Sequence, residues 1–222
     1  MLFGRSLLST APVRKGFFIT GTDTNVGKTV LSALLCAALQ GRYWKPIQTG
    51  ACEGTDRQHV KAWAGVNDAL LFPEAYIFDD PLSPHLAARR AGSEIELAQI
   101  GLPAANSGMP LIVEGAGGVM VPINSQQFMT DLMRHLALPA ILVARSTLGT
   151  INHTLLSVQC LRNAGIEIHG VVLIGSENAD NKAAIEHYGK VRIVGQIPLL
   201  ETINPKTLRD VFARQFVPEF FI

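Results

Sequence analysis

Residues 21–29 read GTDTNVGKT, and they directly follow the apolar run GFFIT at residues 16–20. An apolar strand that leads through a loop into Gly-Lys-Thr, at the start of an apolar helix, is typical of a phosphate-binding loop. The backbone N–H groups of such a loop point at one spot, and the helix dipole adds roughly half a positive charge there. We therefore expect Lys28 to bind the terminal phosphates of a nucleotide and Thr29 to offer its hydroxyl to Mg²⁺.

The spacing of this loop departs from the common pattern, which has four residues between its first glycine and Gly-Lys-Thr. Five residues lie between Gly21 and Gly27, so Thr22 stands where the first glycine is usual. The loop is therefore a variant P-loop. Its expected nucleotide contacts are Thr22, Asp23, Asn25, Val26, Gly27, Lys28, Thr29 and Val30.

Length and composition restrict the class of protein. The chain has 222 residues, which fits one domain with a well-buried core, and 48% of them are hydrophobic. The net charge is +1 and no long run of one sign occurs, so we expect no nucleic-acid partner. No apolar run approaches the roughly 20 residues that span a membrane, so we expect no membrane partner.

Cysteine usage and the first residues bear on location. Cys36, Cys52 and Cys160 are widely spaced and odd in number, which indicates free thiols in a reducing compartment, and we expect a cytoplasmic protein. Residues 1–15 are basic, but their apolar run is too short for a secretory signal, so we expect a flexible extension.

Strands and helices alternate along the chain. Expected strands are 17–20, 43–47, 75–78, 111–114, 140–144, 171–174 and 192–197; expected helices are 30–39, 57–64, 83–90, 93–106, 128–138, 151–164, 180–188 and 205–214. Ser93 and Glu96 are read as the capping box of one of these helices. This order predicts a single α/β domain with a doubly wound, mostly parallel sheet flanked by helices, whose ligands bind at the carboxyl ends of the strands.

Three further residues are expected at that edge. Glu114 ends a continuous apolar strand, where a buried acid is costly unless it is paired or bound to a cation, and it matches the acid that supports Mg²⁺ in P-loop enzymes. Lys45 ends the second strand and could equally be a solvated lysine. Asp56 could equally be a helix N-cap. His85 and His153 are more readily explained as structural residues than as catalysts.

Taken together, these motifs closely resemble those of the dethiobiotin synthetase family. The matching segments, in the family's order, are GTDTNVGKT (21–29), KPIQTG (45–50), the region of Asp56, PLSPH (81–85), VEGAGGVMVPI (113–123), LGTINHT (148–154) and GQIP (195–198). The ordered set covers nearly the whole of residues 16–198.

The resemblance implies an ATP-dependent carbon–nitrogen cyclo-ligase of the P-loop NTPase type. It implies that 7,8-diaminononanoate, CO2 and ATP give dethiobiotin through a carbamate and a carbamic–phosphoric anhydride. Lys28, Lys45 and Thr24 are then the expected catalytic residues, and Thr29, Asp56 and Glu114 the expected Mg²⁺ ligands. Further substrate contacts are expected from Thr49 and Gly117, in addition to Thr24 and Lys45.

The family also implies a homodimer with its active site near the subunit interface. Gly149, Thr150 and Asn152 of one subunit are expected to receive the substrate carboxylate in the site of the other. A helix begins near Ile151, and helix N-termini bind carboxylates.

The base-binding end departs from the family. Ile174 stands where the family often has an adenine-reading Asn, so base recognition is expected from the backbone around Gly195 to Leu199, including Pro198. Nucleoside triphosphates other than ATP are therefore possible substrates. Asn25 replaces an acid that is common in the family, and the apolar tail 217–222 is expected to pack on the body or at the dimer interface.

Two alternatives stay open at this point. One is another variant-P-loop ligase or amide synthase, related to the cobyrinic acid diamide synthases. The other is a partitioning-type ATPase switch, although those proteins carry an extra lysine near the start of the loop and positions 22–26 contain none.

Overall fold

The computed structural model describes residues 16–104 and 108–221. Its centre is a seven-stranded sheet with the strand order β4-β2-β6-β1-β7-β8-β9, in which every neighbouring pair is parallel. In chain order these strands are β1 (Gly16–Gly21), β2 (Arg42–Trp44), β4 (Leu71–Phe72), β6 (Leu111–Glu114), β7 (Ala140–Arg145), β8 (Ile168–Ile174) and β9 (Ile193–Ile197). The predicted doubly wound, mostly parallel fold is confirmed.

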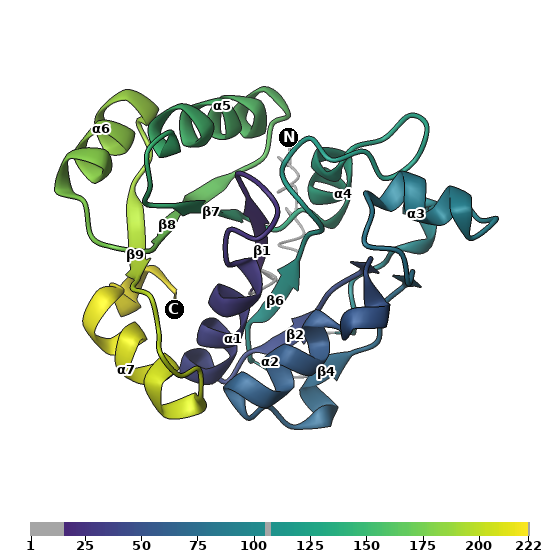
Figure 1. Ribbon diagram of the computed structural model, residues 1–222, viewed down its shortest axis with the longest axis horizontal. Helices are drawn as coiled ribbons and strands as arrows, with labels where there is room; N and C mark the ends of the chain where they lie inside the picture. Colours follow the sequence, from purple (N-terminus) through teal and green to yellow (C-terminus); the bar gives the residue numbers. More distant parts are fainter. Residues whose placement is uncertain (1–15, 105–107, 222) are drawn as a thin grey trace, which may run out of the picture.

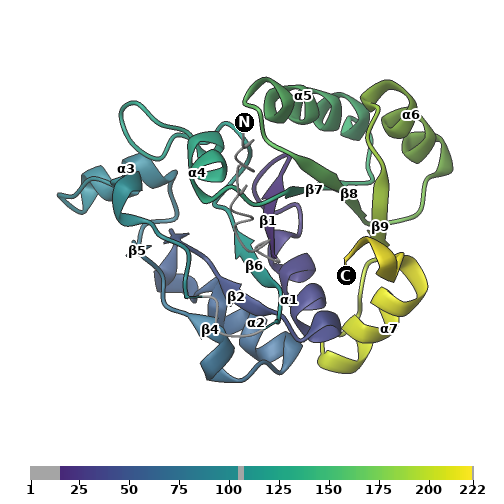
Figure 2. The same cartoon turned by 180° about the vertical axis from the view of Figure 1, so that it is seen from behind.

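Helices cover both faces of this sheet (Figure 1 and Figure 2). One face carries α1 (Lys28–Leu39), α2 (Asp56–Ala64) and α7 (Pro205–Gln215); the other carries α3 (Pro84–Arg90), α4 (Met129–Leu136), α5 (Thr150–Asn163) and α6 (Ala179–Gly189). Among these described helices, none combines the length and the apolar character that crossing a membrane requires.

The continuous apolar strands follow from this double cover. Successive side chains of a strand point to opposite faces, so a strand covered on both sides must be apolar at every position. In β1, Phe17 and Ile19 pack in the core beneath α1 and α7, whereas Phe18 packs in the core beneath α4. In β6, Ile112 and Val113 divide between the same two cores.

The second expected strand, 43–47, was predicted wrongly as one piece. β2 ends at Trp44, and a separate strand β3 (Ile47–Gln48) pairs with β5 (Tyr76–Ile77) in a two-stranded sheet. Pro46 lies between the two strands, where it has no N–H to give to a ladder. Lys45 therefore lies at a break between two sheets. No sequence signal indicated β4 or the short helical turns η1 (Ala51–Glu53), η2 (Asp68–Leu70) and η4 (Pro218–Phe220).

The helix predicted over 93–106 is also wrong. The described part of this segment contains only the short turn η3 (Leu97–Gln99). Pro103 disfavours helix at the residue before it, and Ser93 donates its hydroxyl to the Ala88 carbonyl rather than forming a capping box. Ile95 and Ile100 are both fully buried, so apolar side chains hold the segment, whose helical hydrogen bonds are confined to η3.

The tail after α7 packs on the body, as expected. Phe216 and Phe221 are buried, and their rings contact Phe212 of α7. The backbone of Phe216 forms an antiparallel bridge with Gly195 of β9. The expected extension at residues 1–15 and the last residue of the tail lie outside the described residues.

Candidate active site

The loop from β1 to α1 has the geometry of an anion cradle. α1 begins at Lys28, its N-cap is Gly27 in the left-handed region (φ 100°), and no side chain caps its N-terminus. α1 has no acidic residue of its own in the first turn, so neither a capping side chain nor a carboxylate of the helix itself occupies its first N–H groups. Such an N-terminus favours an anionic ligand.

Lys28 adds a buried cation to this cradle. Its side chain is buried, and its Nζ donates to the Asp23 carbonyl at 2.9 Å. Burial, followed by the charge of Lys45, lowers the pKa of Lys28 to about 8, against the opposing effect of Glu114. A phosphate at this position would stabilise the charged form of the lysine.

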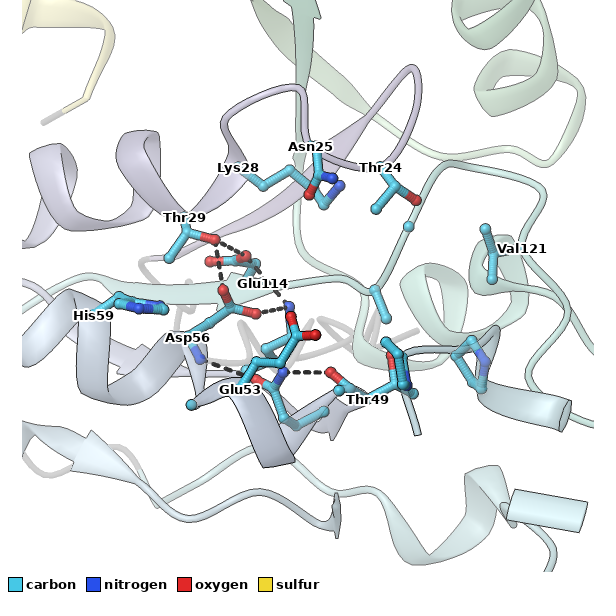
Figure 3. Close-up of a pocket in the computed structure, with 18 of the residues that line it drawn as sticks. Thr24, Asn25, Lys28, Thr29, Thr49, Glu53, Asp56, His59, Glu114 and Val121 are labelled. Atoms are coloured by element: carbon cyan, nitrogen blue, oxygen red, sulfur yellow. Dashed lines mark hydrogen bonds and ion pairs between the residues drawn. The ribbon is translucent and has the colours of Figure 1, made fainter. Parts of the chain in front are cut away.

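Three oxygen atoms from distant segments converge beside the cradle (Figure 3). Thr29 Oγ1 lies 2.8 Å from Asp56 Oδ1 and 2.9 Å from Glu114 Oε1. Thr29 is in the first turn of α1, Asp56 begins α2, and Glu114 ends β6. The fold thus brings together all three of the expected metal ligands.

Lys45 completes this cluster. Its Nζ lies 2.5 Å from Asp56 Oδ2 and 3.4 Å from Glu114 Oε1, and its side chain is buried. Burial alone would lower the pKa of Lys45, but the two carboxylates raise it above its ordinary value. Lys45 in turn lowers the pKa of Asp56 against the opposing effect of burial. Lys45 and Asp56 therefore stabilise each other's charged forms.

The oxygen set fits Mg²⁺. This ion prefers oxygen ligands and is usually held by one or two carboxylates together with water and substrate phosphates. Two carboxylates and one hydroxyl converge here, next to a phosphate cradle. The described residues contain no group of three or more His, Cys, Asp or Glu side chains that could hold a metal, so water and phosphate oxygens would complete the coordination.

A cavity of about 720 Å³ opens over these groups. Figure 3 shows it extending from His59 of α2 past the Thr29, Asp56 and Glu114 cluster to Val121. The expected site residues that line it are Thr24, Asn25, Gly27, Lys28, Thr29, Val30, Lys45, Thr49, Asp56, Glu114 and Gly117.

Other expected residues lie outside this cavity. Val26 packs in the core beneath α1, and exposed Asp23 lies 3.7 Å from Arg145. Within the described part of one chain, the remaining expected residues that do not line the cavity are Thr22, Gly149, Thr150, Asn152, Gly195 and Pro198. Gly149 and Thr150 are at the start of α5, and Asn152 is exposed in its first turn.

Some lining residues were missed at the sequence level. Gln48 lines the cavity, and its Oε1 accepts the backbone N–H of Asp56 at 3.1 Å, so it fixes the start of α2. Gly50 and the segment 81–84 also line the cavity; they belong to family motifs, but no site role was expected for them. The other missed lining residues are Glu53, Gly54, His59, Trp63, Ala116 and Val121.

Where base recognition was expected to depart from the family, Ile174 packs against the phosphate loop. A Cβ atom placed on Gly27 would lie only 2.4 Å from Ile174 Cδ1. A side-chain amide is present nearby on Gln196 of β9, and its Nε2 donates to the carbonyl of Gly175, the residue after Ile174, at 2.9 Å. Ile174 thus buttresses the loop through apolar contact.

The sequence is similar to those of known proteins. The AAA domain family matches residues 15–207. ATP-dependent dethiobiotin synthetase BioD of Brucella ovis is 46% identical over 198 residues, which is 89% of this chain and 92% of the relative. The BioD of Lawsonia intracellularis is 48% identical over 206 residues, 93% of this chain and 98% of the relative.

The chain belongs to the ATP-dependent dethiobiotin synthetase family. Among solved structures, a ParA family ATPase from Chlorobium tepidum matches this dethiobiotin synthetase fold with a TM-score of 0.51 at 12% identity, covering 90% of this chain and 93% of the ATPase. At that identity the match shows the fold alone. The predicted P-loop fold and the predicted family are both confirmed.

Proposed function

We propose that the chain closes the ureido ring of dethiobiotin from 7,8-diaminononanoate and CO2 at the expense of ATP. The observation that carries this proposal is the cluster of Lys28, Thr29, Lys45, Asp56 and Glu114 at one rim, joined by the contacts described above. A carbamate and a triphosphate are both anions. Bringing them into contact requires fixed positive charge, which Lys28 and Lys45 supply.

The reaction needs positioning and charge stabilisation and no protein nucleophile. One amine of the substrate takes up CO2 as a carbamate, whose oxygen attacks the γ-phosphorus and releases ADP. The second amine then attacks the carbonyl carbon of the mixed anhydride, which closes the ring and expels phosphate. In this scheme Lys28 binds the β- and γ-phosphates, and Lys45 stabilises the carbamate and the transferring phosphoryl group.

Thr29, Asp56 and Glu114 would hold Mg²⁺, which supplies neutralising charge to the nucleotide phosphates when bound. Lys45 then exchanges its carboxylate partners for the anionic reactants. Thr24, Thr49 and Gly117 line the same cavity as Lys45 and would contact the carbamate end of the substrate.

The carboxylate end of the substrate is assigned to a second subunit. Gly149, Thr150 and Asn152 lie at the N-terminus of α5, and no side chain caps this terminus. A substrate carboxylate suits such an N-terminus. We propose a homodimer in which this helix end faces the partner's cavity, working in the cytoplasm.

A direct assay tests the proposal. The purified protein is incubated with 7,8-diaminononanoate, bicarbonate, Mg²⁺ and ATP, and dethiobiotin is measured by mass spectrometry. We expect one ADP for each dethiobiotin. ATP hydrolysis that does not depend on the diamine, without dethiobiotin, would overturn the proposal. Parallel reactions with CTP and GTP show how far Gly195, Pro198 and their neighbours restrict the base.

A further inference from the structure

The two oxygens of the Glu114 carboxylate face different parts of the molecule. Oε1 accepts from Thr29 Oγ1 at 2.9 Å and from Lys45 Nζ at 3.4 Å, both of which line the cavity. Oε2 accepts from Ser32 Oγ at 2.7 Å and from Tyr43 Oη at 3.0 Å. One oxygen is therefore turned to the site and the other to the core.

The fold places three of these four donors through two simple relations. Thr29 and Ser32 are three residues apart on α1, so they lie on one face of the helix and α1 supplies a hydroxyl to each carboxylate oxygen. Tyr43 of β2 pairs with Ile112 of β6, and Ile112 and Glu114 point to the same face of the sheet. Tyr43 thus approaches the carboxylate from the neighbouring strand.

Ser32 and Tyr43 are themselves completely buried, and within the described residues neither belongs to the cavity wall. Glu114 is only 1% exposed. A buried carboxylate needs hydrogen-bond donors, and two hydroxyls on one oxygen do more than satisfy it, because they also fix the rotation of the carboxylate plane. The direction in which Oε1 points is therefore set from the core side.

We infer that Ser32 and Tyr43 are positioning residues that hold Oε2 of Glu114 so that Oε1 is presented to a divalent cation beside the nucleotide. The inference rests on the proposed function only in so far as that function uses a metal–nucleotide complex. It assigns a role to two buried hydroxyls that never touch substrate.

Loss of either hydroxyl should weaken metal binding. Hydrogen-bond partners behind a metal ligand typically contribute 10–100-fold to metal affinity. Without the Tyr43 hydroxyl, Oε2 keeps only Ser32 and the carboxylate plane is free to turn away from Thr29 Oγ1. We expect both Tyr43→Phe and Ser32→Ala to bind the metal about 10-fold more weakly.

The test uses Mn²⁺ as the probe and protein saturated with ADP. Free Mn²⁺ is measured by electron paramagnetic resonance, so the readout needs no turnover. Tyr76→Phe is the matched control, because the half-buried Tyr76 hydroxyl accepts the Glu96 N–H at 3.1 Å and does not contact Glu114. Ser157→Ala removes a buried hydroxyl from α5 as the control for Ser32→Ala.

A double-mutant cycle shows whether the hydroxyls act through Glu114. In the Glu114→Gln background, Tyr43→Phe should change the Mn²⁺ dissociation constant less than about twofold. Thermal unfolding in EDTA checks that each variant is folded, and if Tyr43→Phe does not fold, Ser32→Ala carries the same prediction for the same oxygen.

Three results would overturn the inference. They are unchanged Mn²⁺ affinity in the folded variants, equal weakening by Tyr76→Phe and Ser157→Ala, or a full effect of Tyr43→Phe in the Glu114→Gln background. If the wild-type protein bound Mn²⁺–ADP but made no dethiobiotin, the proposed function would fail while this test would still give its answer.

Discussion

At the scale of residues, two lysines share one rim but differ in their surroundings. Burial lowers the pKa of Lys28 to about 8, and its Nζ contacts only a backbone carbonyl among its described hydrogen-bond partners. Lys45 is held by two carboxylates, which raise its pKa above its ordinary value. A bound phosphate would therefore stabilise the charged form of Lys28 more than that of Lys45, which its carboxylate neighbours already stabilise.

The two lysines should consequently have separable roles. Lys45→Ala should lower kcat by roughly 10²–10³-fold, since it removes charge stabilisation from the reacting groups, with little change in ADP affinity. Lys28→Ala should impair both kcat and ADP affinity. Steady-state kinetics and calorimetric titration with ADP measure these effects. Lys61→Ala, at an exposed lysine paired with Asp68, is the control.

If the Lys45 and Lys28 variants lost turnover and ADP affinity in the same proportion, the assigned roles would be wrong. Three members of the cluster were predicted from the residues themselves, because Lys28 and Thr29 belong to a local motif and Glu114 is conspicuous as an acid after an apolar strand. Lys45 and Asp56 were expected there only through the family resemblance. It could not predict the contacts of Tyr43, which depend on β2 lying next to β6 in the correct register.

At the scale of elements, the phosphate loop depends on close contact with β8. Gly27 has a φ of 100°, and a Cβ there would be 2.4 Å from Ile174 Cδ1. A side chain at this position is disfavoured both by the left-handed backbone and by lack of space. The position of the end of β8 and that of the start of α1 therefore depend on each other.

Gly27→Ala should displace the loop and weaken ADP binding by about tenfold or more. The left-handed backbone that the loop needs at this position would cost an alanine about 1–3 kcal/mol. Fluorescence or calorimetric titration with ADP measures the loss. Gly101→Ala is the control, since a Cβ there meets no atom within 4 Å. Equal ADP affinities for the two variants would show that the loop tolerates the side chain.

Element boundaries reveal where sequence reasoning fails. The helices α1, α2 and α5 were predicted close to their observed bounds, and the apolar run of α1 and Gly165 after α5 are local signals. The segment after Ser93 has a plausible cap and apolar spacing, yet it forms only η3. Burial of Ile95 and Ile100, with Pro103 beyond them, outweighs local helical preference.

At the scale of the whole molecule, the proposed substrate carboxylate site and the cavity are separate within one chain. The start of α5 contributes no described residue to the cavity wall. Leu148, just before this helix, is fully exposed, and Leu156 within it is 63% exposed. In the proposed homodimer, these two apolar side chains would be near the helix end that faces the partner's cavity.

Leu148→Glu and Leu156→Asp should therefore weaken self-association and dethiobiotin formation together, while ADP binding stays near the wild-type value because the phosphate loop belongs to one chain. Light scattering after size-exclusion chromatography and the dethiobiotin assay measure the two effects. Ile77→Glu, at a similarly exposed apolar residue of β5, is the control. A fully active monomer would contradict the shared site.

The bridge between Gly195 and Phe216 limits strand pairing between two copies of this protein. β4 and β9 are the two edges of the sheet, and β4 has only two residues while the bridge to Phe216 covers part of β9. Unpaired edge strands are templates for intermolecular strand addition and aggregation. With one edge too short and the other partly occupied, lengthening of the sheet across two molecules is disfavoured, and helical surfaces are left to join them.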